Sequence, residues 1–324
     1  MDVKYKQSPI LIAGNGRLSH SVCVCLIQAK HAVTLFTENK EDAAAAINSH
    51  FLDLFNICAE KPDRKLLEIT SSPGGTADYQ IGIAITGENL KEKIAAIRDL
   101  EKKLFTDSII AINTESIPIS LLQEACNYPE RLIGVNWAEP AHTTYFLEII
   151  INAKTNKEAA DDLFNLAKKQ WNKDPYLVSN DISIRAKMLA VMAREAFYLV
   201  QNGYASIEDI DRACRNDAGY YLPFSGNFRY MDLMGTYAYG LVMKDLNREL
   251  SKEDQVPGFF EEIIEQGDTG MENNKGFYKY EEGDAKRWND LFAKFSYQIQ
   301  HIINKYPFNY KEKATVADNK TSPL

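Results

Sequence analysis

The chain has 324 residues, of which 45% are hydrophobic and 25% are charged, and its formal net charge is −8. These values are ordinary for a globular enzyme of two domains, and the negative charge disfavours nucleic acid or an anionic membrane as the main partner. The sequence shows neither a leader-like N-terminus nor an apolar run long enough to span a membrane, so we expect a cytoplasmic protein. The five cysteines are scattered and odd in number, which predicts reduced thiols and no metal site.

The first half of the chain alternates between segments typical of buried strands and segments with helical periodicity. Predicted strands span residues 8–13, 32–36, 79–86, 108–113, 132–135 and 146–151. Predicted helices span residues 41–59, 89–105, 119–126 and 157–171, together with one that follows the first strand and ends near residue 30. This alternation predicts an α/β fold with a Rossmann-type, doubly wound, mainly parallel sheet that helices cover on both faces.

The second half of the chain changes in pattern after residue 179. Helical periodicity dominates and no strand is evident; the predicted helices span residues 182–202, 206–216, 228–250, 258–266 and 283–306. The first of these helices has the periodicity of a buried element. We therefore predict a sheet domain at residues 1–178, an all-α C-terminal domain at residues 179–306 and a flexible tail at residues 307–324.

The turn after the first predicted strand has the context that a dinucleotide-binding fingerprint requires. It reads Gly14-x-Gly16-x-x-Ser19 and leads into a predicted helix. Gly14 permits the tight turn, Gly16 lets the backbone approach a pyrophosphate, and the helix N-terminus attracts the anion. A generic tight turn of a parallel sheet is the alternative. The residues that we predict to contact the cofactor are Gly14, Asn15, Gly16, Arg17, Leu18, Thr37, Glu38 and Asn113.

The end of the second predicted strand bears on which dinucleotide binds. An acidic residue at this place holds the ribose hydroxyls of NAD, and the strand ends at Thr37-Glu38. Glu38 fits that role, although a solvated loop carboxylate is an equal alternative. Thr37 with Arg17 or Lys40 would instead accept the 2′-phosphate of NADP. Because no convincing arginine follows the strand, we predict NAD as the cofactor and keep NADP as the alternative.

Five short blocks of the chain carry a resemblance to a known family. In order and spacing they resemble the L-3-hydroxyacyl-CoA dehydrogenase family over about residues 9–280; the blocks are Glu88–Lys93, Ile112–Ser116, Asn202–Asp211, Gly226–Asp232 and Gly276–Tyr280. The resemblance implies an NAD(P)-binding domain, a helical domain that forms a homodimer, and an active site in the cleft between them. It also implies a small-molecule substrate, such as a CoA thioester, and a role in fatty acid metabolism.

The segment from Arg131 to Ile150 resembles the active-site segment of this family, with one substitution that matters most. The catalytic histidine of the family corresponds to Asn136, and the glutamate that orients it corresponds to Glu148. An amide cannot take up a proton at neutral pH, and losing a general base lowers a rate by about 10² to 10⁴. A carboxylate within an apolar run is costly unless it is paired or functional, which also marks Glu148 as a site residue.

More substitutions fall at the same site. A serine and two asparagines of the family correspond to Glu115, Glu139 and Ala186. If the two glutamates share one cleft with Glu148, the three carboxylates repel one another and the pKa of at least one rises. Lys187 is included because related hydroxy acid dehydrogenases place a lysine on this helix. The candidate catalytic residues are therefore Glu148, Asn136, Glu139, Glu115 and Lys187.

These substitutions leave three interpretations of function open. The first is an NAD(P)-dependent oxidoreductase that oxidises a 3-hydroxy acid or thioester to its 3-keto form, with Glu139 or another glutamate in place of the histidine. The second is a dehydrogenase of a different hydroxy acid, with a cationic or polyhydroxyl substrate suited to a carboxylate-rich cleft. The third is a dinucleotide-binding homologue without catalytic activity. His142, the one nearby histidine, is interpreted as a loop residue rather than a displaced base.

Overall fold

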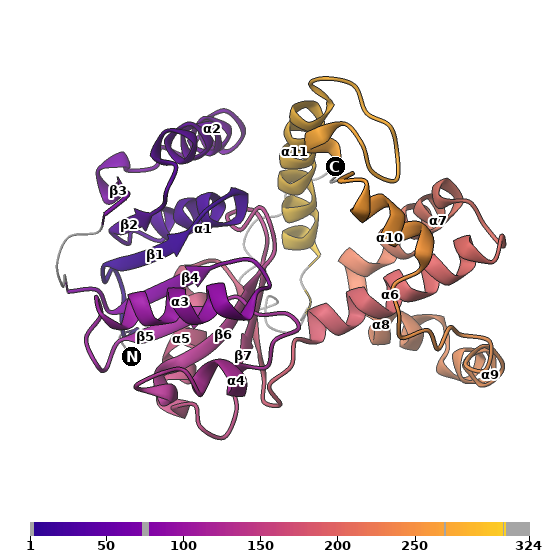
Figure 1. The fold of residues 1–324 in the computed structure, drawn as a ribbon, viewed down its shortest axis with the longest axis horizontal. Helices are drawn as coiled ribbons and strands as arrows, with labels where there is room; N and C mark the ends of the chain where they lie inside the picture. The colour runs from indigo at the N-terminus through magenta and orange to yellow at the C-terminus, as the bar shows by residue number, and fades with distance from the viewer. Residues whose placement is uncertain (1–2, 73–77, 269, 307, 309–324) are drawn as a thin grey trace, which may run out of the picture. The chain divides into compact units, whose positions relative to one another are not determined.

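The computed structural model describes residues 3–72, 78–268, 270–306 and 308. The chain divides into two compact units, Met1–Lys187 and Met188–Leu324 (Figure 1). This division falls a few residues after the predicted boundary at 178–179, within the first helix that follows the sheet. The tail predicted at 307–324 lies outside the described residues apart from Phe308.

An eight-stranded sheet forms the framework of the first unit. Its strands are β1 (Ile10–Gly14), β2 (Val33–Phe36), β3 (Leu67–Thr70), β4 (Ile81–Ile85), β5 (Ile109–Ile112), β6 (Leu132–Trp137), β7 (Phe146–Ile150) and β8 (Asp174–Val178). The strand order is β3-β2-β1-β4-β5-β6-β7-β8, and every neighbouring pair is parallel except β6 and β7. The predicted Rossmann-type, doubly wound and mainly parallel sheet is therefore confirmed, with the reversal of strand order between β1 and β4.

The helices of this unit differ in how their first turns are capped. They are α1 (Arg17–Gln28), α2 (Lys40–Cys58), α3 (Leu90–Glu101), α4 (Ile119–Gln123) and α5 (Lys157–Gln170). The side chains of Asn39, Asn89 and Asn156 accept backbone N–H groups at the starts of α2, α3 and α5, which stabilises each helix. Helix α1 has no side-chain cap and no acidic residue in its first turn. Its first N–H groups therefore remain available to an external anion.

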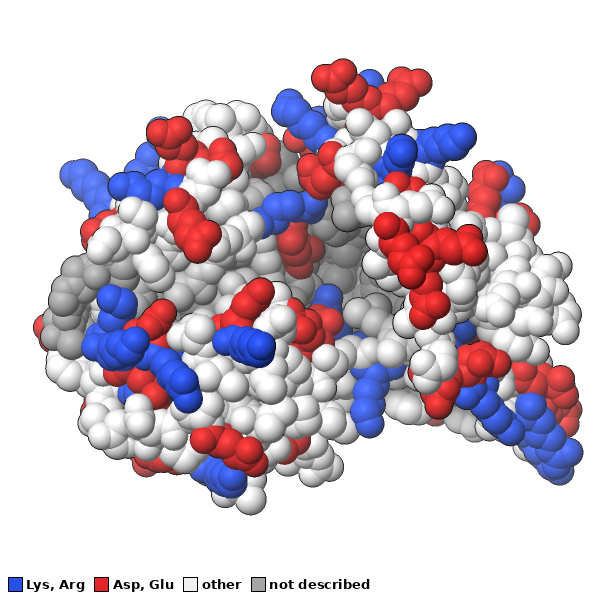
Figure 2. All heavy atoms as spheres, viewed as in Figure 1, with Lys and Arg blue, Asp and Glu red and all other residues white. Residues whose placement is uncertain are grey.

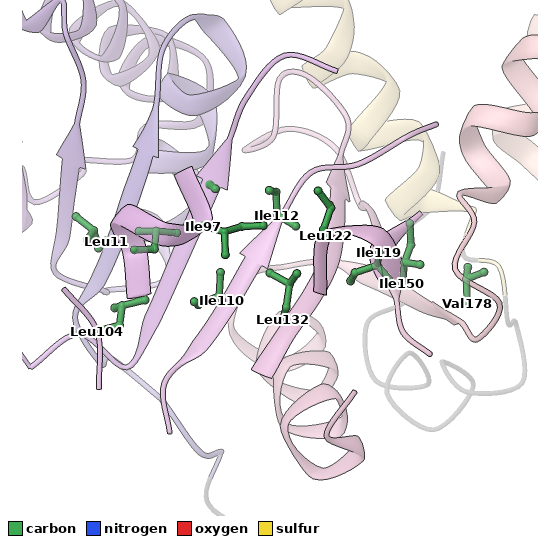
Figure 3. Packing of buried hydrophobic residues seen from close by; sticks show 12 residues of the cluster. Leu11, Ile97, Leu104, Ile110, Ile112, Ile119, Leu122, Leu132, Ile150 and Val178 are labelled. Carbon is green, nitrogen blue, oxygen red and sulfur yellow. The ribbon is translucent and has the colours of Figure 1, made fainter. Parts of the chain in front are cut away.

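A continuous apolar core lies between one face of the sheet and helices α3 and α4 (Figure 3). Ile110 and Ile112 are two positions apart on β5, so both point to the same face. They pack with Ile97 of α3, Leu122 of α4 and Leu132 of β6, all of which are almost completely buried. Each such side chain contributes about 1.5–3 kcal/mol by leaving water. This core holds the ends of β1, β4, β5 and β6 in fixed positions.

The second unit is helical throughout its described residues, apart from isolated bridges. With the end of the first unit it holds α6 (Ile184–Gln201), α7 (Ile207–Ala213), α8 (Gly219–Met234), α9 (Thr236–Leu246), α10 (Gly258–Glu265) and α11 (Asp284–Lys305). The predicted all-α C-terminal domain is confirmed. The single helix predicted at 228–250 is wrong, because Gly235 has φ 107° and separates α8 from α9. The expectation that the first helix is buried is also wrong, since α6 has no buried residue.

Surface charge is distributed over both units. On the face shown in Figure 2, basic and acidic side chains are intermixed rather than gathered into one block. Among the described residues, none of the helices combines the length and hydrophobicity needed to cross a bilayer.

Candidate functional site

A cavity of about 800 Å³ opens where β1, β2, β4 and β5 end. Parallel strands bring these ends to one edge of the sheet, and the reversal of strand order at this edge is the usual place for a dinucleotide. The cavity is lined by every residue predicted to contact the cofactor except Gly16, together with side chains of α3. The predicted residues that line it are Gly14, Asn15, Arg17, Leu18, Thr37, Glu38 and Asn113.

The turn between β1 and α1 has the shape that a bound pyrophosphate requires. A Cβ atom on Gly14 would lie 2.7 Å from the carbonyl oxygen of Ile85, so only glycine allows this close contact between β1 and β4. Gly16 has φ 85°, a left-handed conformation that side chains rarely adopt. The N–H groups of the uncapped α1 follow directly. The residues present therefore fit a dinucleotide at this turn.

Asn15 connects this turn to the end of β2. Its Oδ1 accepts hydrogen bonds from the hydroxyl of Thr37 at 2.7 Å and from the N–H of Glu38 at 3.1 Å. Thr37 is buried and its donor is occupied, whereas the Glu38 carboxylate is exposed beside the cavity. This arrangement favours Glu38 as the ribose ligand and gives no support to Thr37 as a donor to a 2′-phosphate.

Lys93 is a residue of this edge to which the sequence gives no functional role. It lies on α3, is 0% exposed, and its Nζ donates to the carbonyl of Asn113 at 2.6 Å and to Thr86 Oγ1 at 3.2 Å. Its Nζ is also 3.1 Å from Oε2 of Glu88. Burial lowers the pKa of Lys93, and the nearby Glu88 carboxylate opposes that change. One signal in the sequence predicts its burial: the spacing of Lys93 and Ile97 places both on one face of α3.

Glu88 organises the turn that follows β5. Its Oε1 accepts the consecutive N–H groups of Glu115, Ser116 and Ile117 at 3.0, 2.7 and 3.0 Å. Although burial acts to raise it, the N–H groups of Ser116 and Ile117 hold the pKa of Glu88 below its usual value. Glu88 and Lys93 together fix the turns after β4 and β5, which border the cavity.

Asn136 is locked into the framework rather than presented to the cavity. It lies on β6 and is 2% exposed. Its Oδ1 accepts the N–H of Thr114 at 2.9 Å, and its Nδ2 donates to the carbonyl of Thr114 at 2.8 Å and to Oε2 of Glu148 at 2.9 Å. Every polar atom of the side chain is thus engaged. Asn136 holds β5 and β6 together and supports Glu148, which pairs with it in the antiparallel register.

Glu148 lies at the centre of a buried hydrogen-bond network. It is 0% exposed. Besides Asn136, it accepts hydrogen bonds from the hydroxyls of Ser183 at 2.6 Å and Tyr176 at 3.0 Å. It also accepts the first N–H groups of α6, from Ile184 at 2.8 Å and Arg185 at 3.1 Å. The carboxylate predicted to be paired or functional is the N-terminal cap of α6, where its charge is favoured. Burial and this carboxylate raise the pKa of Tyr176.

The other two carboxylates of the predicted cluster each face an arginine. Oε1 of Glu139 accepts the Nε–H of Arg17 at 2.6 Å, and Glu115 forms an ion pair with Arg185. The arginines that neutralise them are distant in sequence. The structure therefore does not contain the expected group of three mutually repelling carboxylates. Because two of them are already paired with arginines, they give no reason to expect a cationic substrate. Lys187 is exposed on α6.

His142 lies in the loop after β6 and is 7% exposed. Burial, with the charges of His50 and Lys173, lowers the pKa of His142 to about 3. Burial also lowers the pKa of His50 to about 4, and the two rings are 4.7 Å apart. An imidazole that resists protonation this strongly is a poor proton acceptor near neutral pH. This geometry agrees with the interpretation of His142 as a loop residue.

We expect this histidine pair to make the protein sensitive to acid. In the unfolded chain both rings bind protons with a pKa of about 6.5, so the unfolded state takes up more protons as the pH falls below that value. The free energy of unfolding then falls with pH, by at most about 1.4 kcal/mol per pH unit for each ring, until the folded pKa is reached. Urea unfolding at pH 7, 6 and 5 measures this slope. His142→Gln should reduce the slope, and His301→Gln on exposed α11 should not; an unchanged slope in His142→Gln would contradict the expectation.

Two family models match consecutive parts of the chain. The model described as "3-hydroxyacyl-CoA dehydrogenase, NAD binding domain" matches residues 9–182. The model described as "3-hydroxyacyl-CoA dehydrogenase, C-terminal domain" matches residues 184–280. Together they cover most of the chain, and the first contains the whole cavity and the three glutamates of the predicted cluster, Glu115, Glu139 and Glu148.

Individual relatives agree in fold and differ in the reactions that their names state. A 5-formyl-3-hydroxy-2-methylpyridine 4-carboxylate 5-dehydrogenase of Mesorhizobium japonicum is 27% identical over 252 residues, which are 74% of this chain and 81% of that protein. A crystal structure of an enzyme with that activity, described as an NAD⁺-dependent dismutase, has a TM-score of 0.83 at 23% identity and covers 92% of this chain and 99% of that one. The fatty acid oxidation complex subunit alpha of Shewanella baltica is 29% identical over 216 residues, 66% of this chain but only 30% of that subunit.

Proposed function

We propose a function from one premise: the chain belongs to the 3-hydroxyacyl-CoA dehydrogenase family. It is an NAD-dependent oxidoreductase of that family, and we propose that it oxidises the hydroxyl of a 3-hydroxy acid or thioester to the keto form. NAD, when bound, accepts the hydride. The observation that carries the proposal is the cavity of about 800 Å³ beside the uncapped start of α1. There the chain's own residues bind the dinucleotide, with Glu38 toward its ribose and Arg17 at its pyrophosphate.

In the proposed active site, the proton acceptor lies at a different position from the histidine of the family. Asn136 has no basic atom, and the oxygens of Glu148 already accept five hydrogen bonds. Glu139 is different, because its side chain is 32% exposed and is held by the exposed side chain of Arg17. We assign Glu139 as the acceptor of the hydroxyl proton. Arg185, which Glu115 holds in an ion pair, and the exposed Lys187 are assigned to substrate binding, and Glu115 is assigned to positioning Arg185.

The proposed substrate is small and acidic. The relative from Mesorhizobium japonicum is named for a pyridine carboxylate, and this chain covers 81% of it. The fatty acid oxidation subunit is covered to only 30%, so a role in fatty acid metabolism has weaker support. Arg185 and the exposed Lys187, both on α6, suit an anionic substrate, whereas a cationic or polyhydroxyl substrate has no comparable support. A short CoA thioester remains the alternative within the same reaction.

Two measurements test this function. Titration with NADH, followed by fluorescence, should show saturable binding, and NADPH should bind more weakly because Glu38 repels a 2′-phosphate. Incubation with NAD⁺ and a panel of short 3-hydroxy acids, hydroxylated pyridine carboxylates and 3-hydroxybutyryl-CoA should produce NADH with at least one of them. Gly16→Val tests whether binding occurs at the predicted turn. A β-branched residue at φ 85° is strained, so binding should weaken at least tenfold while circular dichroism stays unchanged. Failure of the native protein to bind NADH would refute the proposal.

One observation favours a second candidate function, a dinucleotide-binding homologue without turnover. Asn136, at the position of the family's histidine, is fully engaged in structural hydrogen bonds. If saturable NADH binding occurs but no member of the panel is oxidised, this second function is favoured. Oxidation of any panel member excludes it.

We also propose that the protein is a cytoplasmic homodimer that associates through the helical unit. Large apolar side chains are exposed along that unit, among them Met192, Leu233, Leu241 and Phe295. Such exposure is more than scattered surface residues require. Multi-angle light scattering that gives the mass of a single chain at micromolar concentration would refute the dimer.

A further inference from the structure

Arg17 connects two places that the proposed function uses. It is the first residue of α1, directly after Gly16, and it lines the cavity of about 800 Å³. Its Nε donates to Oε1 of Glu139 at 2.6 Å. The Arg17–Glu139 pair therefore joins the cofactor cavity to the loop between β6 and β7, residues 138–145.

The backbone of this loop is fixed independently of the ion pair. The N–H of Ala141 donates to the hydroxyl of Ser21 on α1 at 3.0 Å. The buried Nζ of Lys173 donates to the carbonyls of Ala141 and Thr144. The side chains of Arg17 and Glu139, in contrast, are 55% and 32% exposed. The ion pair can thus open by rotation of two side chains while the loop backbone stays in place.

The charges around the cavity set up a competition for Arg17. Among the described residues that line it, the cations are Arg17, at the turn, and Lys103, after α3. A pyrophosphate at the turn therefore meets Arg17 as its nearest charged partner, and Glu139 already holds that partner. An exposed ion pair contributes little net free energy. An arginine–phosphate contact is charge-assisted and adds to the attraction of the α1 N-terminus. Arg17 should therefore bind the phosphate in preference to Glu139.

We propose that dinucleotide binding opens the Arg17–Glu139 pair, so that Arg17 turns to the pyrophosphate and Glu139 is released toward the substrate. In the free protein the carboxylate of Glu139 is held by the guanidinium of Arg17. In the cofactor complex the hydroxyl proton of the substrate passes to Glu139 as its hydride passes to NAD⁺. This last step rests on the proposed function. The opening of the pair does not, because it concerns cofactor binding alone.

A double-mutant cycle on NADH affinity tests the opening of the pair. Titrations by fluorescence at low salt compare the native protein, Glu139→Gln, Arg17→Met and the double variant. Glu139→Gln should bind NADH roughly 1.5- to 5-fold more tightly, because it removes the carboxylate that competes for Arg17. This factor corresponds to the small free energy that an exposed ion pair contributes. Arg17→Met should bind more weakly, and Glu139→Gln should add nothing in its background. Glu208→Gln is the matched control, because Glu208 forms an exposed ion pair of the same length with Arg212, at 2.6 Å, and neither residue is among the described residues that line the cavity.

Two outcomes would overturn the proposal. Unchanged or weaker binding by Glu139→Gln would mean that Glu139 orients Arg17 for the phosphate instead of competing for it. An equal gain in the Arg17→Met background, or in Glu208→Gln, would mean a general effect of removing negative charge. ADP-ribose, which has the pyrophosphate, should reproduce the gain, whereas adenosine should not. All of these readouts are affinities, so the absence of turnover would refute the proposed function without affecting this result.

Discussion

Replacing Glu148 with alanine is expected to lower the free energy of unfolding of the sheet unit by about 3–5 kcal/mol, through lost buried hydrogen bonds and a lost helix cap. The carboxylate is 0% exposed and accepts five hydrogen bonds, two of them from the first N–H groups of α6. Its removal leaves buried donors on Asn136 and Ser183 without this partner, and each unsatisfied group costs about 1–3 kcal/mol. It also removes the cap of α6. The sum of these costs exceeds the effect of a typical substitution.

Urea unfolding measures this loss. Trp137 and Trp171 both lie in the sheet unit, with their rings stacked 5.6 Å apart, and the third tryptophan, Trp288, lies in the helical unit. In a Trp288→Phe background, tryptophan fluorescence therefore reports on the sheet unit. Glu148→Gln keeps one acceptor oxygen and should lose less stability than Glu148→Ala. Tyr176→Phe removes a single donor and should cost only about 1 kcal/mol. A midpoint for Glu148→Ala equal to that of Tyr176→Phe would show that the network does not stabilise the fold in this way.

The sequence predicts the elements of the sheet where apolar runs are long and fails where they are short or interrupted. Strand β3 has four residues and no fully buried side chain, and β8 contains Pro175. Neither segment therefore has a sequence pattern that predicts a strand. Both are edge strands that form only because a neighbour is already in place. In the helical unit, Gly235 lies within an otherwise periodic segment. Periodicity cannot show that its φ of 107° ends the helix.

The partners of the carboxylates at the candidate site were harder to predict from the sequence than the cofactor-binding turn, for a physical reason. The turn is local, because Gly14, Asn15 and Gly16 act within one connection between a strand and a helix. The partners of the carboxylates are not local: Arg17 precedes Glu139 by more than a hundred residues, and Arg185 follows Glu115 by seventy. Without those arginines the sequence indicates a surplus of negative charge that the folded edge of the sheet does not have.

Replacing Glu139 with glutamine is expected to lower kcat by about 10² to 10⁴, the range that a general base contributes. The glutamine side chain would match the native one in size but could not take up the proton of the substrate hydroxyl. NADH binding should persist, because the turn and Glu38 are untouched. The loss should therefore fall on kcat at saturating cofactor, and kcat/KM for the substrate should fall with it. Stopped or continuous assays of NADH formation with the best substrate of the panel measure both effects.

The controls separate chemistry from charge and from folding. Glu68→Gln, on exposed β3 and away from the residues that line the cavity, removes the same charge and should leave kcat unchanged. Glu139→Asp keeps a carboxylate on a shorter side chain and should retain more activity than Glu139→Gln. Full activity in Glu139→Gln would exclude Glu139 as the proton acceptor. Asn136→His would then be informative, because it restores the family's base only at the cost of the hydrogen bonds to Thr114. A gain of activity in that variant, despite lower stability, would show that the native protein lacks an effective proton acceptor and that a base on β6 can supply one.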